Sequence, residues 1–226
     1  MSKRRTRDPR AEAGRVSKRS APHRGVPPFD VAPIIPVLRS HPFNDPAWVF
    51  EPKYDGFRGL VYLAAGTCLI RSKRGATLKR FASLCNALPR ELDVKNAILD
   101  GEVLALNKTG QPQFTDLLTG STTLAYAAFD LLWLNGRDLR HLPLTERKER
   151  LIRILPTSGG QVFGVLTVPE RGWDLFEAVQ RVDMEGIVAK RKSDPYAAGT
   201  VWFKIKNPRY TQAPGRGELF NRPRRK

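Results

Sequence analysis

A lysine followed at short, fixed spacing by an acid, a glycine and an arginine is the segment of this sequence best suited to chemistry. The residues are Lys53, Asp55, Gly56 and Arg58, within the stretch Glu-Pro-Lys-Tyr-Asp-Gly-Phe-Arg-Gly. A lysine attacks phosphorus only as a neutral amine, which burial or neighbouring positive charge favours. Glycine permits a tight turn or the close approach of a ligand, and the arginine fork suits a phosphate. The segment predicts a nucleophile beside an anion clamp; the alternative is an ordinary surface turn with a solvated lysine.

Four further segments follow in order along the chain. They are Asp100-Gly101-Glu102, Phe129-Asp130-Leu131-Leu132, Glu185-Gly186-Ile187-Val188-Ala189-Lys190 and Trp202-Phe203-Lys204-Ile205-Lys206. With the lysine segment, they resemble motifs I, III, IIIa, IV and V of the covalent nucleotidyltransferases, which comprise ATP-dependent DNA ligases, RNA ligases and mRNA-capping guanylyltransferases. The resemblance covers residues 30–207. The residues of these motifs are most similar to those in the adenylation domain of bacterial ATP-dependent DNA ligases, including the ligase modules of end-joining systems.

The resemblance implies an ATP-grasp-like α+β fold in which antiparallel sheets enclose a nucleotide pocket. The apolar patterns of the sequence agree with a mixed α and β structure. Short apolar runs bounded by turn residues predict strands over residues 48–53, 57–63, 67–72, 97–106, 124–134, 161–168, 186–190 and 201–206. Helical spacing predicts helices over residues 77–88, 145–155 and 173–182, with Thr145 as the N-cap of the second.

The resemblance also implies a three-step ligation at Lys53. The lysine attacks the α-phosphate of ATP and expels pyrophosphate, which leaves a lysyl–AMP phosphoramidate. AMP then passes to a 5′-phosphate at a nick in DNA, and a 3′-hydroxyl displaces it. Such phosphoryl chemistry requires mainly positioning and charge neutralisation. Two alternatives are an RNA ligase or GTP-using capping-type transferase of the same fold, and a non-catalytic remnant that binds nicks.

Two glutamates are the expected metal or ribose ligands. Glu102 and Glu185 each lie next to a glycine in a predicted strand, where burying a carboxylate is costly unless a cation or hydroxyl meets it. The alternative is an exposed glutamate at a strand end. Asp55 and Asp100 are weaker candidates, because aspartate before glycine is common in turns. The metal expected with ATP is Mg²⁺ or Mn²⁺, held by carboxylates and phosphates.

The remaining nucleotide contacts are assigned by the resemblance. It implies that Phe129 stacks on the purine and that Glu51 hydrogen-bonds the base. Arg58 is expected to contact a phosphate or sugar, and Lys190 is a further nucleotide-binding candidate. By its sequence alone, a phenylalanine in an apolar strand is more often a core residue.

Two lysines near the end of the resemblance share one side of a strand. Lys204 and Lys206 alternate with Phe203 and Ile205, so the lysines face one way and the apolar pair the other. The alternatives are a solvated edge strand and a face covered by phosphate. We expect these lysines to contact the α-phosphate.

The charge of the chain favours a polyanionic partner. The chain has 39 Lys and Arg residues against 22 Asp and Glu residues, a net charge of +17. Each neutralised phosphate of a nucleic acid releases counterions, so nicked double-stranded DNA is the expected partner. We expect a disordered basic arm over residues 1–26, the adenylation domain over 27–207 and an irregular basic tail over 208–226.

Several classes of protein are disfavoured. Cys68 and Cys85 are too few and too far apart for a disulfide framework or a zinc site. No apolar stretch reaches the length of about 18 to 20 residues that a membrane span requires, and no secretory signal is visible. The expected location is the bacterial cytoplasm, in association with the nucleoid.

The resemblance stops after motif V. DNA ligases of this type continue with an OB-fold domain, which carries the pyrophosphate-orienting motif VI and clamps DNA. Here only irregular sequence follows Lys206. We therefore expect a lone adenylation domain, whose missing part comes from a separate OB-fold chain or an end-joining partner.

Overall fold

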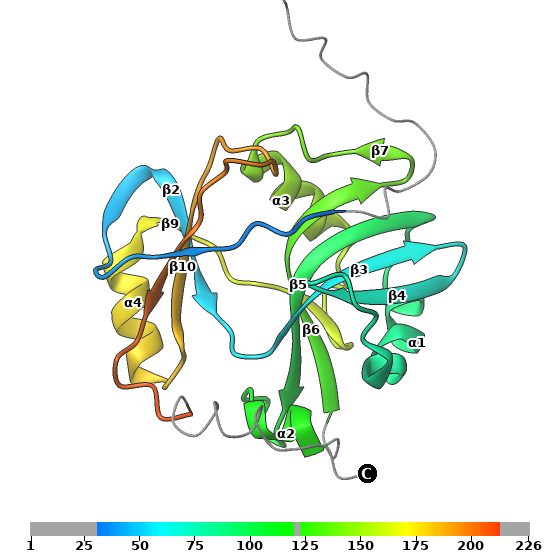
Figure 1. Ribbon diagram of the computed structural model, residues 1–226, viewed down its shortest axis with the longest axis horizontal. Coiled ribbons are helices and arrows are strands. Elements are labelled where there is room, and N and C mark those ends of the chain that lie inside the picture. The colour runs from blue at the N-terminus through cyan, green and yellow to red at the C-terminus, as the bar shows by residue number, and fades with distance from the viewer. Residues whose placement is uncertain (1–30, 120–122, 213–226) are drawn as a thin grey trace, which may run out of the picture.

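A computed structural model describes residues 31–119 and 123–212. The described chain forms two β-sheets, which are joined by segments that pass from one sheet to the other (Figure 1). The expected arm of residues 1–26 and residues 213–226 of the expected tail lie outside the described residues. Within the described part of the chain, no helix is long and apolar enough to cross a bilayer.

The larger sheet, sheet B, is built from one stretch of sequence. In chain order, its strands are β3 (Phe57–Ala64), β4 (Thr67–Ser72), β5 (Asn96–Leu106), β6 (Thr123–Leu134) and β7 (Arg137–Asp138). Across the sheet they lie in the order β4-β3-β5-β6-β7. A further short strand, β8 (Val162–Gly164), pairs in parallel with β6. Helix α1 (Ala82–Glu91) packs Leu84 and Leu88 on one face of this sheet. Ile98 and Trp133 are buried on the other face. Burial on both faces explains why β5 and β6 read as long apolar runs rather than alternating ones.

The smaller sheet, sheet A, joins segments from both ends of the described chain. In chain order, its strands are β1 (Val37–Leu38), β2 (Asn44–Lys53), β9 (Val168–Arg171), β10 (Gly186–Arg191) and β11 (Phe203–Lys206). Across the sheet they lie in the order β1-β11-β10-β2-β9. Helix α4 (Gly172–Arg181) covers its outer face (Figure 1). Leu175, Phe176 and Val179 of α4 pack against Phe50 and Ile187 of the sheet.

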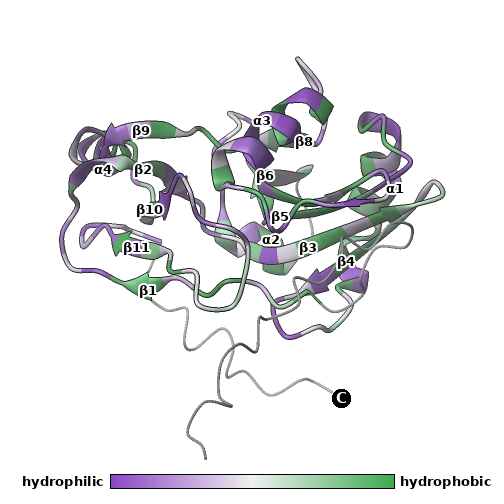
Figure 2. Cartoon of the chain, turned by 90° about the horizontal axis from the view of Figure 1, so that it is seen from above, coloured by the Kyte–Doolittle hydropathy of each residue, from purple (hydrophilic) through white to green (hydrophobic). Residues whose placement is uncertain are grey.

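Two further α-helices belong to the described structure. Helix α2 (Phe114–Thr119) follows β5, and α3 (Leu144–Ile154) packs against β6. Helix α3 is coloured mostly hydrophilic in Figure 2, although four of its side chains are buried. These are Leu144, Arg147, Lys148 and Leu151.

Most predicted elements form within a few residues of their expected bounds, but three predictions were wrong. Residues 161–168 do not make one strand: the chain leaves sheet B after β8 and joins sheet A as β9. The helix expected from residue 77 begins with a 3₁₀ turn at Lys79–Phe81, because Thr77 is still bridged to Arg71 of β4. Thr145 is not an N-cap, because Pro143 takes that position with its fixed φ of −53°.

Candidate functional site

The predicted nucleophile lies at the end of a strand, where the chain passes from one sheet to the other. Lys53 is the last residue of β2, and β3 of sheet B begins four residues later. In the antiparallel pairing of β2 with β10, Lys53 lies opposite Gly186. This register brings Glu185 to the lysine: Lys53 Nζ donates a hydrogen bond of 2.5 Å to Glu185 Oε2. Lys206 Nζ lies 4.0 Å from the other oxygen, Oε1.

Two glycines make this approach of strands possible. A Cβ atom added to Gly56 would lie 2.2 Å from the carbonyl oxygen of Val103 and 2.9 Å from Cγ of Glu102. Gly186 has a φ of +145°, and an added Cβ would lie 2.1 Å from the carbonyl oxygen of Ile205. Any larger residue at either position would push apart the backbone segments that carry the site.

A cavity of about 690 Å³ between the sheets collects most of the predicted site residues. The predicted residues in its lining are Glu51, Lys53, Arg58, Glu102, Phe129, Glu185, Lys190 and Lys204. The exception is Lys206, which lies outside this lining with a side chain 57% exposed and reaches the site only through Glu185. A volume of this size is within the range that holds a nucleotide-sized ligand. The structure therefore brings these side chains together; their roles remain predictions.

Glu51 is fixed in the cavity wall by two lysines. Its Oε1 is ion-paired with Lys148 of α3, and its Oε2 lies 2.6 Å from Lys190 Nζ. Burial acts to raise the pKa of Glu51, but the attraction of the two lysines is stronger and leaves the pKa below its usual value. Burial lowers the pKa of Lys190 to about 8, against the opposing effect of Glu51. Glu51 is thus held as an ionised acceptor.

Phe129 lies beside the same charges. Lys190 Nζ is 4.2 Å from the centre of its ring and 4.1 Å from that of Trp202. The two rings meet edge to face, with their centres 5.9 Å apart. Lys148 also donates to the main-chain carbonyl of Phe129. The half-buried ring is therefore anchored and still contributes to the lining of the cavity.

Arg58 is directed toward protein oxygens. Its Nε and Nη2 donate to the two carboxylate oxygens of Asp100 at 3.0 and 2.6 Å, and Nη1 donates to the carbonyl of Ile34. Tyr196 donates its hydroxyl hydrogen to Asp100 Oδ2. With all three nitrogens engaged, the expected phosphate contact would require Arg58 to rearrange, and Asp100 serves as the counter-ion of Arg58.

The pKa of Glu102 lies well above the usual value for a glutamate. Burial raises its pKa to about 7, although Lys53 and Arg58 act to lower it. Among the described residues, no group of three or more histidine, cysteine, aspartate or glutamate side chains could hold a metal by itself. Two carboxylates, Glu102 and Glu185, line the cavity. Mg²⁺ is usually bound by one or two carboxylates together with substrate phosphates, so this donor set fits the expected ion.

The comparison with known families agrees with this geometry. The family model described as "ATP dependent DNA ligase domain" matches residues 37–206. The chain belongs to the ATP-dependent DNA ligase family. The matched region contains both sheets and every residue of the cavity that was predicted from the sequence.

Two relatives show which members of the ligase family this chain resembles. The multifunctional non-homologous end joining protein LigD of Mycolicibacterium smegmatis is 30% identical over 201 residues, which are 84% of this chain and 26% of that protein. The SPbeta prophage-derived DNA ligase-like protein LigB of Bacillus subtilis is 27% identical over 198 residues, 80% of this chain and 69% of that protein. The chain spans about a quarter of the LigD relative's length.

Solved ligase structures have the same fold. A mycobacterial DNA ligase D complexed with ATP and MES matches with a TM-score of 0.66 and 26% identity, over 79% of this chain and 61% of that one. A Chlorella virus DNA ligase-adenylate, at 17% identity and a TM-score of 0.52, covers 71% of this chain and 61% of its own and supports the fold alone. The predicted adenylation domain, its LigD-like type and its α+β fold with antiparallel sheets are confirmed.

The sequence did not reveal two buried cations of this ligase domain. Arg147 donates Nε and Nη2 to the buried carboxylate of Asp130, at 2.8 and 2.9 Å, and Lys148 holds Glu51. Both belong to α3, which reads as a charged helix. The signal was their spacing: Leu144, Arg147, Lys148 and Leu151 fall on one helical face, so the two cations share the buried side with the leucines.

Proposed function

We propose that this chain is an ATP-dependent DNA ligase that forms a lysyl–AMP intermediate at Lys53 and seals nicks in DNA. The observation that carries the proposal is the position of Lys53, in the wall of a nucleotide-sized cavity and hydrogen-bonded to a buried carboxylate. The names of the LigD relatives support a place in DNA repair by end joining. A bacterial, cytoplasmic location near the nucleoid goes with this role.

In the first step, Nζ of Lys53 forms a bond to the α-phosphorus of ATP. The bond from that phosphorus to the bridging oxygen breaks, and pyrophosphate leaves. Glu185 Oε2 already accepts a hydrogen bond from Nζ, so it is the group positioned to take the ammonium proton. Lys204, half-buried in the same lining, supplies positive charge for the phosphates.

The purine of ATP is proposed to lie between Phe129 and the ionised Glu51. A carboxylate that is held ionised accepts hydrogen bonds and donates none, so it favours the exocyclic amine of adenine over the carbonyl oxygen of guanine. The lysines at its two oxygens keep it in that state. Phe129 offers an aromatic face for stacking.

Glu102 and Glu185 are the residues that we propose to hold Mg²⁺ or Mn²⁺. When bound, the ion supplies charge neutralisation to the phosphates. Burial that raises the pKa of Glu102 to about 7 would be offset by a cation, which favours the ionised carboxylate. Glu185 would serve the ion as a carboxylate once the proton that it takes from Lys53 has passed on to solvent.

Incubation with α-labelled ATP and magnesium, followed by a denaturing gel, tests the proposal, with labelled GTP in parallel. Wild-type protein should acquire a label from ATP, and Lys53→Arg, which keeps the charge but not the nucleophile, should not. Adding nicked DNA should remove the label and yield sealed product. A nicked RNA duplex provides the comparison for the acceptor.

The possible outcomes separate the alternatives. Label from GTP, or sealing of RNA in preference to DNA, would assign the chain to another branch of the same fold. No label from either nucleotide, with manganese included, would support a remnant that binds nicks without reacting. A label that persists after nicked DNA is added would restrict the proposal to its first step.

A further inference from the structure

The six residues that follow β11 form a strap, residues 207–212, that leads from sheet A to α2. At its start, the Asn207 amide nitrogen donates to the carbonyl of Glu185, at 2.9 Å. Further along, Thr211 donates its amide and hydroxyl hydrogens to the carboxylate of Asp183 at 3.0 and 2.5 Å. At its end, Gln212 Oε1 accepts a hydrogen bond of 3.2 Å from the amide of Phe114, the first residue of α2. The strap thus connects sheet A, close to Lys53, with α2.

The middle of the strap reaches the lysine segment itself. The hydroxyl of Tyr210 donates a hydrogen bond of 2.7 Å to Asp55 Oδ2, and both residues are buried. Asp55 is the second residue after Lys53, in the short connection that leads to β3. Burial, together with the carboxylates of Glu185 and Asp183, raises the pKa of Tyr210, so the phenol remains a donor at neutral pH.

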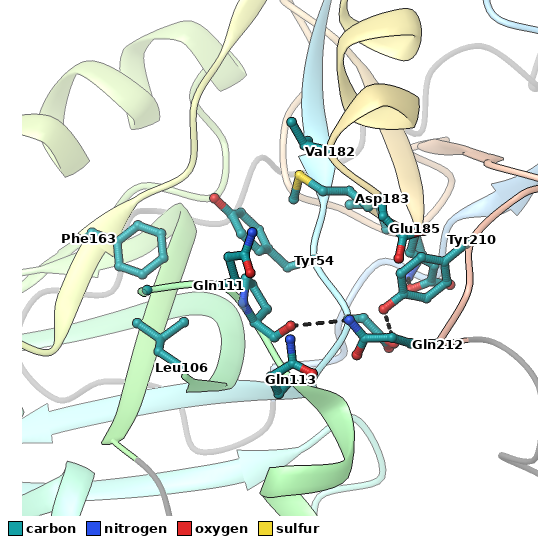
Figure 3. Close-up of a pocket in the computed structure, with 15 residues that line it drawn as sticks. Tyr54, Leu106, Gln111, Gln113, Phe163, Val182, Asp183, Glu185, Tyr210 and Gln212 are labelled. Atoms are coloured by element: carbon teal, nitrogen blue, oxygen red, sulfur yellow. Dashed lines mark hydrogen bonds and ion pairs between the residues drawn. The ribbon is translucent and has the colours of Figure 1, made fainter. Parts of the chain in front are cut away.

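A second cavity, of about 570 Å³, lies where the strap meets the lysine segment (Figure 3). Lys53, Tyr54 and Asp55 line one part of it, and Tyr210 and Gln212 line another. Figure 3 shows the Tyr210 ring beside Glu185, with its hydroxyl turned inward. Lys53 and Glu185 line both this cavity and the nucleotide cavity. Tyr210 therefore lines a cavity that shares Lys53 and Glu185 with the proposed nucleotide cavity, and it is not part of the lining of the nucleotide cavity itself.

We propose that Tyr210 is a positioning residue for adenylation, acting through Asp55. Its hydrogen bond fixes the direction of the Asp55 carboxylate and the course of the backbone directly after Lys53. Fixing this connection holds Nζ in line with the α-phosphate, because small displacements of a nucleophile greatly slow phosphoryl transfer. The assignment rests on the proposed function of the domain.

The hydrogen bond from Tyr210 to Asp55 can be removed without detaching the strap. Asn207, Thr211 and Gln212 hold the strap through other segments, so loss of one phenolic oxygen leaves it in place. Tyr210→Phe removes only the hydroxyl. Thr211→Val is the matched control, because it removes one strap hydroxyl whose partner is the half-buried carboxylate of Asp183 and not a residue of the lysine segment.

The test measures single-turnover adduct formation over a range of ATP concentrations, with melting temperatures in parallel. Tyr210→Phe should lower the maximal rate about tenfold, the equivalent of one hydrogen bond to a charged group, with the KM for ATP within about twofold of wild type. Thr211→Val should leave both parameters unchanged. In an Asp55→Asn background, Tyr210→Phe should have a much smaller effect, because the two residues act as one unit.

Hydrogen exchange of the amides of residues 54–56 provides a measurement that does not need turnover. Tyr210→Phe should increase their exchange rate and Thr211→Val should not. Equal effects of the two variants, a change in melting temperature or KM alone, or full additivity with Asp55→Asn would overturn the positioning role. If wild-type protein forms no adduct, the proposed function fails, and the exchange measurement still decides whether Tyr210 orders the lysine segment.

Discussion

Lys53 and Glu185, which are 132 residues apart in the sequence, are brought to 2.5 Å by the antiparallel register of β2 and β10. The lysine side chain is 23% exposed and the glutamate side chain 10%. Water therefore competes weakly for the contact, which suits the proposed transfer of a proton from the lysine to the carboxylate. The pairing of two strands thus determines the geometry of this ion pair.

Replacing Glu185 with glutamine should slow adduct formation about 10²- to 10⁴-fold, the usual contribution of a positioned proton acceptor. The amide keeps the shape of the side chain but has no negative charge to receive the proton. Single-turnover labelling with α-labelled ATP measures the effect. Glu149→Gln, at an exposed position of α3, is the matched control. A rate within threefold of wild type would mean that Glu185 is not the acceptor.

Lys148→Met should weaken ATP binding. The substitution removes one of the two cations at Glu51 and leaves a buried carboxylate with a single partner. We expect the KM for ATP in adduct formation to rise about tenfold, with partial recovery in Lys148→Arg. Lys192→Met, which removes an ion pair with the exposed Glu170, should have little effect on KM. An unchanged KM in Lys148→Met would separate Glu51 from base recognition.

Breaking the pair of Arg147 and Asp130 should strongly destabilise the domain. Both side chains are at most 1% exposed, so Arg147→Met leaves a buried carboxylate without its main partner. The expected loss is about 3 to 5 kcal/mol of unfolding free energy, measured by urea titration. Glu177→Gln, which removes an exposed pair with Arg181 on α4, should change stability by less than about 0.5 kcal/mol. Similar losses in both variants would contradict the assignment.

Glu102 should make stability fall as the pH rises. Burial raises its folded-state pKa to about 7, above the ordinary value of 4.5, so the native state binds the proton more tightly than the unfolded chain. The stabilising contribution is complete below about pH 4.5 and is lost as the pH rises through 7. Relative to Glu102→Gln, wild-type protein without metal should lose at most about 3 kcal/mol between pH 5 and 8. Parallel stability curves would refute the shift.

Removing residues 1–26 should weaken binding to nicked DNA without preventing adduct formation. This segment has nine Lys or Arg residues against two acids. Its loss should reduce the slope of log affinity against log salt, because fewer counterions are released. Fluorescence anisotropy at several salt concentrations measures the slope. An unchanged slope would show that these residues do not contact the phosphates.

The sequence predicted the part of the site that lies in short, recognisable segments. The lysine segment and the strands that carry Glu102, Phe129 and Lys190 were expected, and the structure brings them to one cavity. Their strands were also recognisable because burial on both faces of sheet B produces continuous apolar runs.

The sequence did not predict contacts that depend on tertiary pairing. Lys148 reads as a surface charge until α3 is packed over Glu51. Arg58 has the residue type of a phosphate clamp, yet Asp100 takes two of its nitrogens. Tyr210 belongs to a stretch with no periodicity, and only the fold shows that its hydroxyl reaches Asp55.

The interleaving of the two sheets has a consequence for synthesis of the domain. Every described strand of sheet B lies between residues 57 and 164, whereas sheet A needs β1 and β2 from before this stretch and β9, β10 and β11 from after it. A nascent chain on the ribosome can complete sheet B early, while β2 remains unpaired until β9 and β10 have been synthesised. The last strand to emerge, β11, pairs with β1 and β10. Lys53 and Glu185, the proposed nucleophile and proton acceptor, therefore come together late in synthesis, and a chain that stops before β10 would contain sheet B without this pair.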